Sequence, residues 1–184
     1  MSPRVWHSAC TETHTRYREP VAHAFPTLRA QDLGGIARDL PGALDGDPSI
    51  LLVAFQRRQQ AAVDGWLPWL AELRGRWPKI EVYELPTISR RWRPARALID
   101  GGMRSAIPDP GTRRRTLTVY TDVGSVLRAL GLEGTGTIAI VAVAPGGTIV
   151  WQGLGEFDPV KAAELEQALA DHAAGAVEAP RPEE

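Results

Sequence analysis

The sequence feature that most restricts the possible folds of this chain is the apolar run at residues 49–55 (Ser-Ile-Leu-Leu-Val-Ala-Phe). An Asp-Pro pair precedes it and the polar segment 56–58 follows it, so the run has the length of a strand. It shows no alternation with polar residues, which is typical of a strand buried on both faces of a sheet. We therefore expect a central sheet with helices packed against both faces.

The segments that follow predict alternating helices and strands. Residues 61–73 carry apolar side chains at helical spacing and predict a helix kinked at Gly65 and Pro68. Strands are predicted at 80–85 and 117–120, with a short helix at 95–104 between them. Asp122 is a predicted N-cap of a helix that ends at Gly131. Alternation of this kind implies parallel pairing of the strands.

The last part of the chain breaks this alternation. Two strand-like runs, 137–144 and 148–152, are separated only by Pro-Gly-Gly, and so short a connection requires an antiparallel hairpin. Asp158 then caps a terminal helix with Pro159 at its first position. We expect an α/β, three-layer fold with a mixed central sheet, a C-terminal β-hairpin and a terminal helix.

The domain organisation follows from length and composition. A chain of 184 residues suits one well-buried core. Residues 1–24 lack periodicity and are predicted to form an N-terminal arm, and residues 25–174 form the domain. Residues 175–184 are rich in proline and glutamate, and we expect a disordered acidic tail there.

This order of elements resembles the thioredoxin-like superfamily, and the additional strand and helix at about 116–131 resemble the peroxiredoxin and TlpA-like branch. Such a scaffold would carry redox cysteines between Phe55 and Trp66 and a cis proline where this chain has Gly136. The one cysteine of the chain is Cys10, far upstream. Without a thiolate and a resolving partner at this place, thiol-disulfide exchange or peroxidase chemistry has no chemical basis there.

One cysteine-poor branch fits the local sequence better. The first strand and helix carry Phe55, Gln60, Val63, Asp64 and Trp66, the segment 102–108 reads Gly-Met-Arg-Ser-Ala-Ile-Pro, and 136–153 ends in Thr-Ile-Val-Trp-Gln-Gly. Together they resemble the family of mitochondrial ATP-synthase assembly chaperones over roughly residues 50–170. The resemblance implies a non-redox binding module that assists the assembly of another protein.

A protein client is therefore the expected partner, at a surface near Gln60, Trp66 and Gly136. The predicted binding residues are Arg57, Arg58, Gln60, Trp66, Trp92, Arg93, Gly136 and Thr137. Plainer interpretations stay open at this point. Gln59 and Asp64 suit solvated surface, Gln60 suits a bond to nearby backbone, and Trp66 and Trp69 suit core and pocket wall.

The alternative function is an enzyme that uses the same cleft for non-thiol chemistry on a small anionic metabolite. Asp64 is the candidate general acid or base, and Arg57, Arg58 or Arg93 would anchor the substrate. This alternative requires a pocket on the order of several hundred cubic ångströms in which Asp64 and an arginine converge. A flat or filled site favours the binding protein.

Charge is unevenly distributed along the chain. Residues 86–115 hold eight arginines and two aspartates, whereas residues 156–184 hold eight acidic and two basic residues. Arginine forks match carboxylates and phosphates, and Trp92 adds a stacking surface. The arginines either pair with the acidic C-terminal segment or meet an external anionic partner, such as a small anionic ligand. The net charge of −1 and the lack of a recognised nucleic-acid-binding fold argue against a nucleic-acid partner.

The N-terminal arm carries a further, weaker signal. His7, Cys10 and His14 have spacing that could supply three ligands to a thiophilic metal ion, but an arm without rigid structure is a poor frame for them. We predict no metal site and no cofactor. No apolar run is long enough to cross a membrane, and the N-terminus has no secretory-signal core, so we expect a cytoplasmic protein that is not integral to a membrane.

Overall fold

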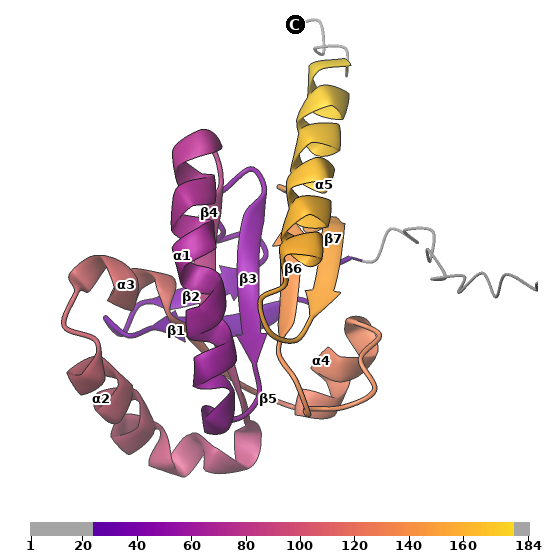
Figure 1. Ribbon diagram of the computed structural model, residues 1–184. Helices are drawn as coiled ribbons and strands as arrows, with labels where there is room; N and C mark the ends of the chain where they lie inside the picture. Colours follow the sequence, from indigo (N-terminus) through magenta and orange to yellow (C-terminus); the bar gives the residue numbers. More distant parts are fainter. Residues whose placement is uncertain (1–23, 179–184) are drawn as a thin grey trace, which may run out of the picture.

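The computed structural model describes residues 24–178, which are built around a seven-stranded mixed sheet (Figure 1). The strands lie in the order β2-β1-β5-β4-β3-β6-β7. Their bounds are β1 Leu28–Asp32, β2 Ala37–Leu40, β3 Ser49–Ala54, β4 Glu81–Ser89, β5 Leu117–Thr121, β6 Ala139–Val143 and β7 Ile149–Leu154. The helices are η1 Arg57–Gln59, α1 Gln60–Arg76, η2 Arg90–Ala95, α2 Arg96–Ala106, α3 Pro110–Arg115, α4 Val123–Ala129 and α5 Pro159–Glu178.

The directions of the central strands place several chain segments at one edge of the sheet. Strands β3, β4 and β5 are parallel, so their carboxyl ends lie at the same edge. Strand β6 is antiparallel to β3, so the loop that precedes β6 reaches this edge as well. We call it the carboxyl edge. The beginning of α1 and the loop before β6 therefore meet there, although they are far apart in the sequence (Figure 1).

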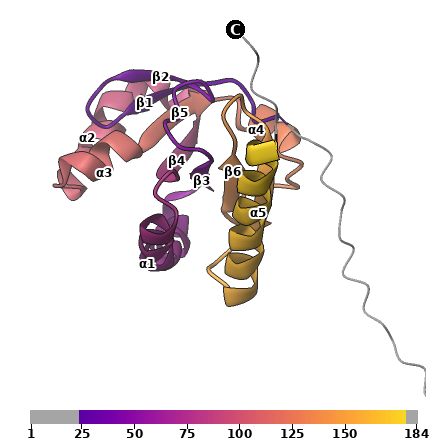
Figure 2. The same ribbon diagram turned by 90° about the horizontal axis from the view of Figure 1, so that it is seen from above.

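Alternate residues of β3 point into two separate hydrophobic layers. Ile50 and Leu52 pack with α1 and α5 on one face, and Leu51 and Val53 pack with α4 on the other. Figure 2 shows α1 and α5 together on one side of the sheet and α4 on the opposite side. Every one of these four β3 side chains is fully buried, as the continuous apolar run predicted.

The predicted three-layer α/β arrangement is confirmed, including the parallel pairing of β3, β4 and β5 and the antiparallel β6–β7 hairpin. Asp122 caps α4 by accepting a hydrogen bond from the Gly124 N–H, and Asp158 accepts one from the Val160 N–H at the start of α5. Helix α1 continues through Pro68 to Arg76. Strand β4 continues four residues beyond the predicted end at Leu85.

Three parts of the fold were not predicted from the sequence. Strands β1 and β2 form an antiparallel hairpin that joins the sheet beside β5, and α3 lies between the predicted helix at 95–104 and the predicted strand at 117–120, where no element was predicted. Helix α5 extends to Glu178, so residues 175–178 are helical and do not belong to the expected tail. The predicted N-terminal arm lies almost wholly outside the described residues.

Candidate functional site

The turn between β3 and α1 is held by the side chain of Gln59, which is buried. Its Oε1 accepts hydrogen bonds from the backbone N–H groups of Phe55 (2.8 Å) and Gln56 (3.0 Å). Its Nε2 donates to the carbonyl oxygen of Thr135 at 2.9 Å. One amide therefore satisfies two backbone donors of the turn and ties the turn to the loop before β6.

A second amide binds the same threonine. The Nε2 of Gln56 donates to the Thr135 carbonyl at 2.9 Å and lies 3.0 Å from the Thr135 hydroxyl. The Nε of Arg58 in turn donates to Gln56 Oε1 at 2.6 Å. We call Gln56, Gln59 and Thr135 the amide bridge. The place where a redox scaffold would carry its cysteines is thus occupied by side-chain amides that bind one another's neighbouring segments through hydrogen bonds.

The interpretation of Gln59 as solvated surface is wrong, because its amide is buried within the amide bridge. Gln60 also departs from its interpretation, since its Nε2 donates to the carboxylate of Asp64 at 2.9 Å rather than to backbone. Asp64 itself is exposed, as expected for solvated surface. The bridging role of Gln59 depends on Thr135, 76 residues away, and nothing in the local sequence indicates that contact.

A carboxyl group missed in the sequence lies beneath the start of α1. Glu84 projects from β4, and burial raises the pKa of this carboxyl above its usual value. The nearby charge of Asp64 raises the pKa further, while a hydrogen bond from Gln60 opposes the shift. Glu84 therefore places a carboxyl group with a raised pKa close to the start of α1.

Five predicted binding residues lie exposed at the carboxyl edge. Arg57 and Arg58 belong to η1, Gln60 begins α1, and Gly136 and Thr137 lie in the loop before β6. We call these five residues the carboxyl-edge surface. A Cβ atom added at Gly136 would meet no atom within 4 Å, so this position is open to an approaching chain.

Trp66 does not belong to that surface, and its prediction as a binding residue is wrong. Its side chain is fully buried, with ring centroids 5.2 Å from Phe157 and 6.0 Å from Trp69. Its Nε1 donates to the Gly155 carbonyl at 3.1 Å. These contacts place Trp66 in the core, where a client cannot reach it, in agreement with the plainer interpretation.

Trp92 and Arg93 lie on η2 and do not line one cavity with Asp64. Trp92 is 51% exposed, and the Arg91 guanidinium lies 5.8 Å from its ring centroid. Arg93 lines a pocket of about 300 Å³ on the side of β5 and β1. Neither this pocket nor a second one near Tyr83 includes Asp64 or Glu84.

The arginines of residues 86–115 do not pair with the acidic C-terminal segment within the part that the structure describes. Arg96 forms an ion pair with Asp100 inside the same stretch, 3.1 Å apart. Glu166 of α5 pairs with Arg76 of α1, at 2.9 Å, and not with the arginine-rich stretch. Pairing with the acidic segment is thus not seen among the described residues, and an external anionic partner stays a prediction.

The proposed metal ligands His7, Cys10 and His14 lie outside the described residues. Among residues 24–178, no group of three histidine, cysteine or acidic side chains could hold a metal ion. No helix in that part of the chain is long and apolar enough to cross a membrane.

No protein-family model matches the sequence, and no curated protein matches it. Solved structures match the fold. A proposed electron transport protein from Aquifex aeolicus VF5 has a TM-score of 0.58 at 17% identity, covering 83% of this chain and 98% of its own. A proposed thiol:disulfide interchange protein DsbE from Chlorobium tepidum has a TM-score of 0.51 at 14% identity, covering 82% and 96%.

A third structure has the same character. The exposed lipoprotein thioredoxin Etrx1 from Streptococcus pneumoniae strain TIGR4 has a TM-score of 0.51 at 14% identity and covers 79% of this chain and 99% of its own. At these identities the likeness shows the architecture alone. The chain therefore has a thioredoxin-like fold.

Proposed function

We propose that this chain is a non-redox thioredoxin-like protein that binds a protein client at the carboxyl-edge surface and assists its assembly. The observation that carries this proposal is the amide bridge. Gln56 and Gln59 hold Thr135 where thiol exchange would need a thiolate, and the sequence contains no cysteine other than Cys10. The turn is thereby fixed as a rigid platform, which suits binding rather than thiol chemistry.

The chemistry of the carboxyl-edge surface favours an acidic, extended client segment. Arg57 and Arg58 are exposed on η1, and neither forms an ion pair with a described carboxylate. The backbone N–H groups of Gly136 and Thr137 form no hydrogen bond with any described residue. An extended peptide could accept these bonds along its main chain while its acidic side chains meet the arginines.

The assembly role rests on the resemblance to the ATP-synthase assembly chaperones. The enzyme alternative has one observation in its favour, the raised pKa of Glu84 beside Asp64. It also requires a cavity where Asp64 and an arginine converge, and the pocket that holds Arg93 contains neither carboxyl group. We therefore prefer the binding role.

A charge reversal tests this surface. We expect Arg57→Glu to weaken binding of a fluorescein-labelled, glutamate-rich extended peptide by at least about fivefold. The attraction between the Arg57 guanidinium and the glutamates of the peptide becomes a repulsion between like charges. The measurement is fluorescence anisotropy at constant ionic strength. Lys79→Glu is the matched control, because Lys79 is also exposed but lies before β4, at the opposite edge of the sheet.

The control should bind like the unmodified chain. Equal losses in both variants would show that only total charge matters. Absence of saturable binding by the unmodified chain, for both this peptide and a neutral one of the same length, would overturn the proposal.

A further inference from the structure

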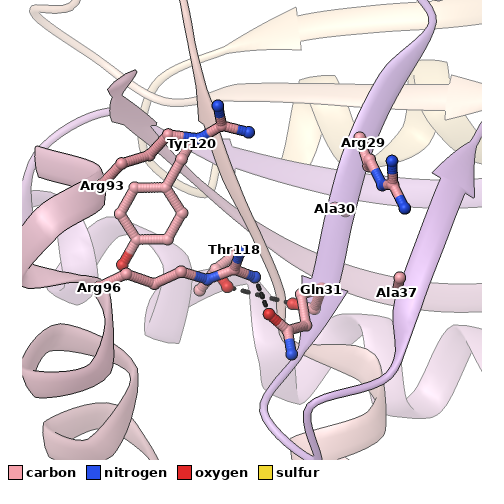
Figure 3. A pocket seen from close by; sticks show the side chains of 8 residues that line it. All are labelled: Arg29, Ala30, Gln31, Ala37, Arg93, Arg96, Thr118 and Tyr120. Carbon is pink, nitrogen blue, oxygen red and sulfur yellow. Dashed lines mark hydrogen bonds between the residues drawn. The ribbon is translucent and has the colours of Figure 1, made fainter. Parts of the chain in front are cut away.

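The pocket beside Arg93 is separate from the carboxyl-edge surface and brings Arg93 and Arg96 together with Arg29, which lies far from them in the sequence. Figure 3 shows Arg93 and Arg96 reaching in from the helical side, with Arg29 on β1 across the pocket. Strands β1, β2 and β5 form its floor, and its volume is about 300 Å³. The full lining is Arg29, Ala30, Gln31, Ala37, Arg93, Arg96, Thr118 and Tyr120.

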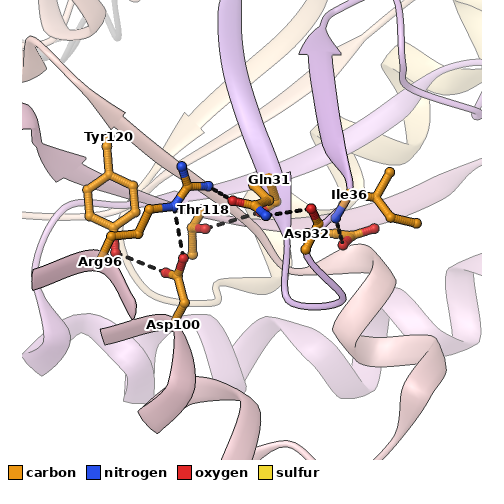
Figure 4. Close-up of polar contacts among 8 residues, drawn as sticks. Gln31, Asp32, Ile36, Arg96, Asp100, Thr118 and Tyr120 are labelled. Carbon is orange, nitrogen blue, oxygen red and sulfur yellow. Dashed lines mark hydrogen bonds and ion pairs between the residues drawn. The ribbon is translucent and has the colours of Figure 1, made fainter. Parts of the chain in front are cut away.

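Arg96 is held in place by neighbours on three sides (Figure 4). Its Nε donates to Asp100 at 3.1 Å, and its Nη2 donates to the Gln31 side chain. Its guanidinium lies 5.2 Å from the ring centroid of Tyr120. These contacts fix the plane of the guanidinium before any ligand arrives, and a preorganised group loses less entropy on binding.

Tyr120 completes this support. Its hydroxyl donates to Asp100 at 2.9 Å. Burial raises the pKa of Tyr120, and the hydrogen bond and the charge of Asp100 raise it further, so the phenol stays protonated and remains a donor. Asp100 is therefore occupied by Arg96 and Tyr120 together.

The charge of the lining is unbalanced. Three arginines line the pocket, and the lining contains no acidic side chain. Asp100 balances Arg96, whereas Arg29 and Arg93 have no carboxylate within ion-pair distance among the described residues. Asp39 lies opposite Arg29 in the β1–β2 register and forms no ion pair with it. About two positive charges thus remain without a partner around one small cavity.

We propose that this pocket binds a small oxyanion with two negative charges, carried as a phosphoryl group or as a pair of carboxylates. Arginine forks match the oxygens of both groups, and two uncompensated guanidiniums match the charge. The volume suits a small molecule, and the floor of Ala30, Ala37 and Thr118 leaves room for a compact organic body. This inference does not depend on client binding, because no residue of the carboxyl-edge surface lines the pocket.

Isothermal titration calorimetry at constant ionic strength tests the site, with inorganic phosphate, pyrophosphate and succinate as separate probes. We expect saturable binding of at least one dianionic probe, and the stronger probe tells whether phosphoryl or dicarboxylate chemistry is preferred. Arg29→Gln and Arg93→Gln should each weaken that binding by about tenfold, because each removes a charge-assisted fork. Arg104→Gln is the control, since Arg104 is exposed on α2 and does not line the pocket.

Circular dichroism checks that each variant keeps the fold, and Arg93→Gln on exposed η2 provides a second test if the strand variant Arg29→Gln does not fold. Equal weakening by Arg104→Gln would show diffuse charge attraction and would overturn the proposal. Lack of saturable binding of all three probes up to about 10 mM would also overturn it. Neither result would bear on the proposal of client binding, because that proposal is tested with a peptide and with different variants.

Discussion

Replacing Trp66 by alanine is expected to lower the free energy of unfolding by about 3–5 kcal/mol. The indole projects from α1, is fully buried, and packs against Trp69 of the same helix and Phe157 of the segment after β7. Truncation removes this contact area and leaves a cavity. It also leaves the Gly155 carbonyl without its indole donor.

Urea denaturation followed by far-ultraviolet circular dichroism measures this loss. Trp92→Ala is the matched control, because Trp92 is half exposed on η2 and its loss should change the free energy of unfolding by less than about 0.5 kcal/mol. Trp66 would instead be a surface residue if the two variants lost similar amounts of stability.

Gln59→Ala is expected to cost about 2–3 kcal/mol of stability, the second largest effect. It removes an acceptor from the Phe55 and Gln56 N–H groups and a donor from the Thr135 carbonyl. These backbone groups lie in a partly buried turn where solvent replaces the lost bonds poorly. The expected loss of stability therefore comes from backbone groups left without hydrogen-bond partners and not from lost apolar contact.

The neighbouring glutamines provide the controls. Gln56→Ala should cost less than Gln59→Ala because Gln56 is only half-buried, and Gln60→Ala should cost least because Gln60 is exposed. Chemical denaturation of the three variants under one set of conditions gives the order. A loss at Gln60 as large as that at Gln59 would contradict the amide bridge as the element that holds the turn.

The fold was predictable from the sequence where the residues of a single element indicate its structure without help from distant segments. The buried strand β3, the helix caps at Asp122 and Asp158 and the Pro-Gly-Gly turn each follow from local chemistry. Strands β1 and β2 were missed because Leu-Arg-Ala-Gln-Asp and Ala-Arg-Asp-Leu contain few residues that favour strands. Their conformation depends on pairing with each other and with β5.

The candidate sites were predictable only in part, for a similar reason. Exposed positions such as Arg57 and Gly136 followed from their place between elements, but the buried amide of Gln59 lies in a polar stretch that resembles surface. The arginine pocket is lined by residues of segments that include β1, η2 and β5. Arg93 was among the predicted binding residues, but Arg29 and Tyr120, which line the same pocket, were not. Contacts across distant segments are set by tertiary packing, which local patterns do not contain.

Catalysed reduction of insulin by dithiothreitol, followed by turbidity, most directly tests the claim that this thioredoxin-like fold has no redox role. Structures with the same architecture include proteins named for thiol-disulfide interchange and electron transport, so the assay separates shared fold from shared chemistry. We predict a time course equal to that of dithiothreitol alone, for the intact chain and for Cys10→Ser. Reduction accelerated to the level of a thioredoxin control would contradict the account.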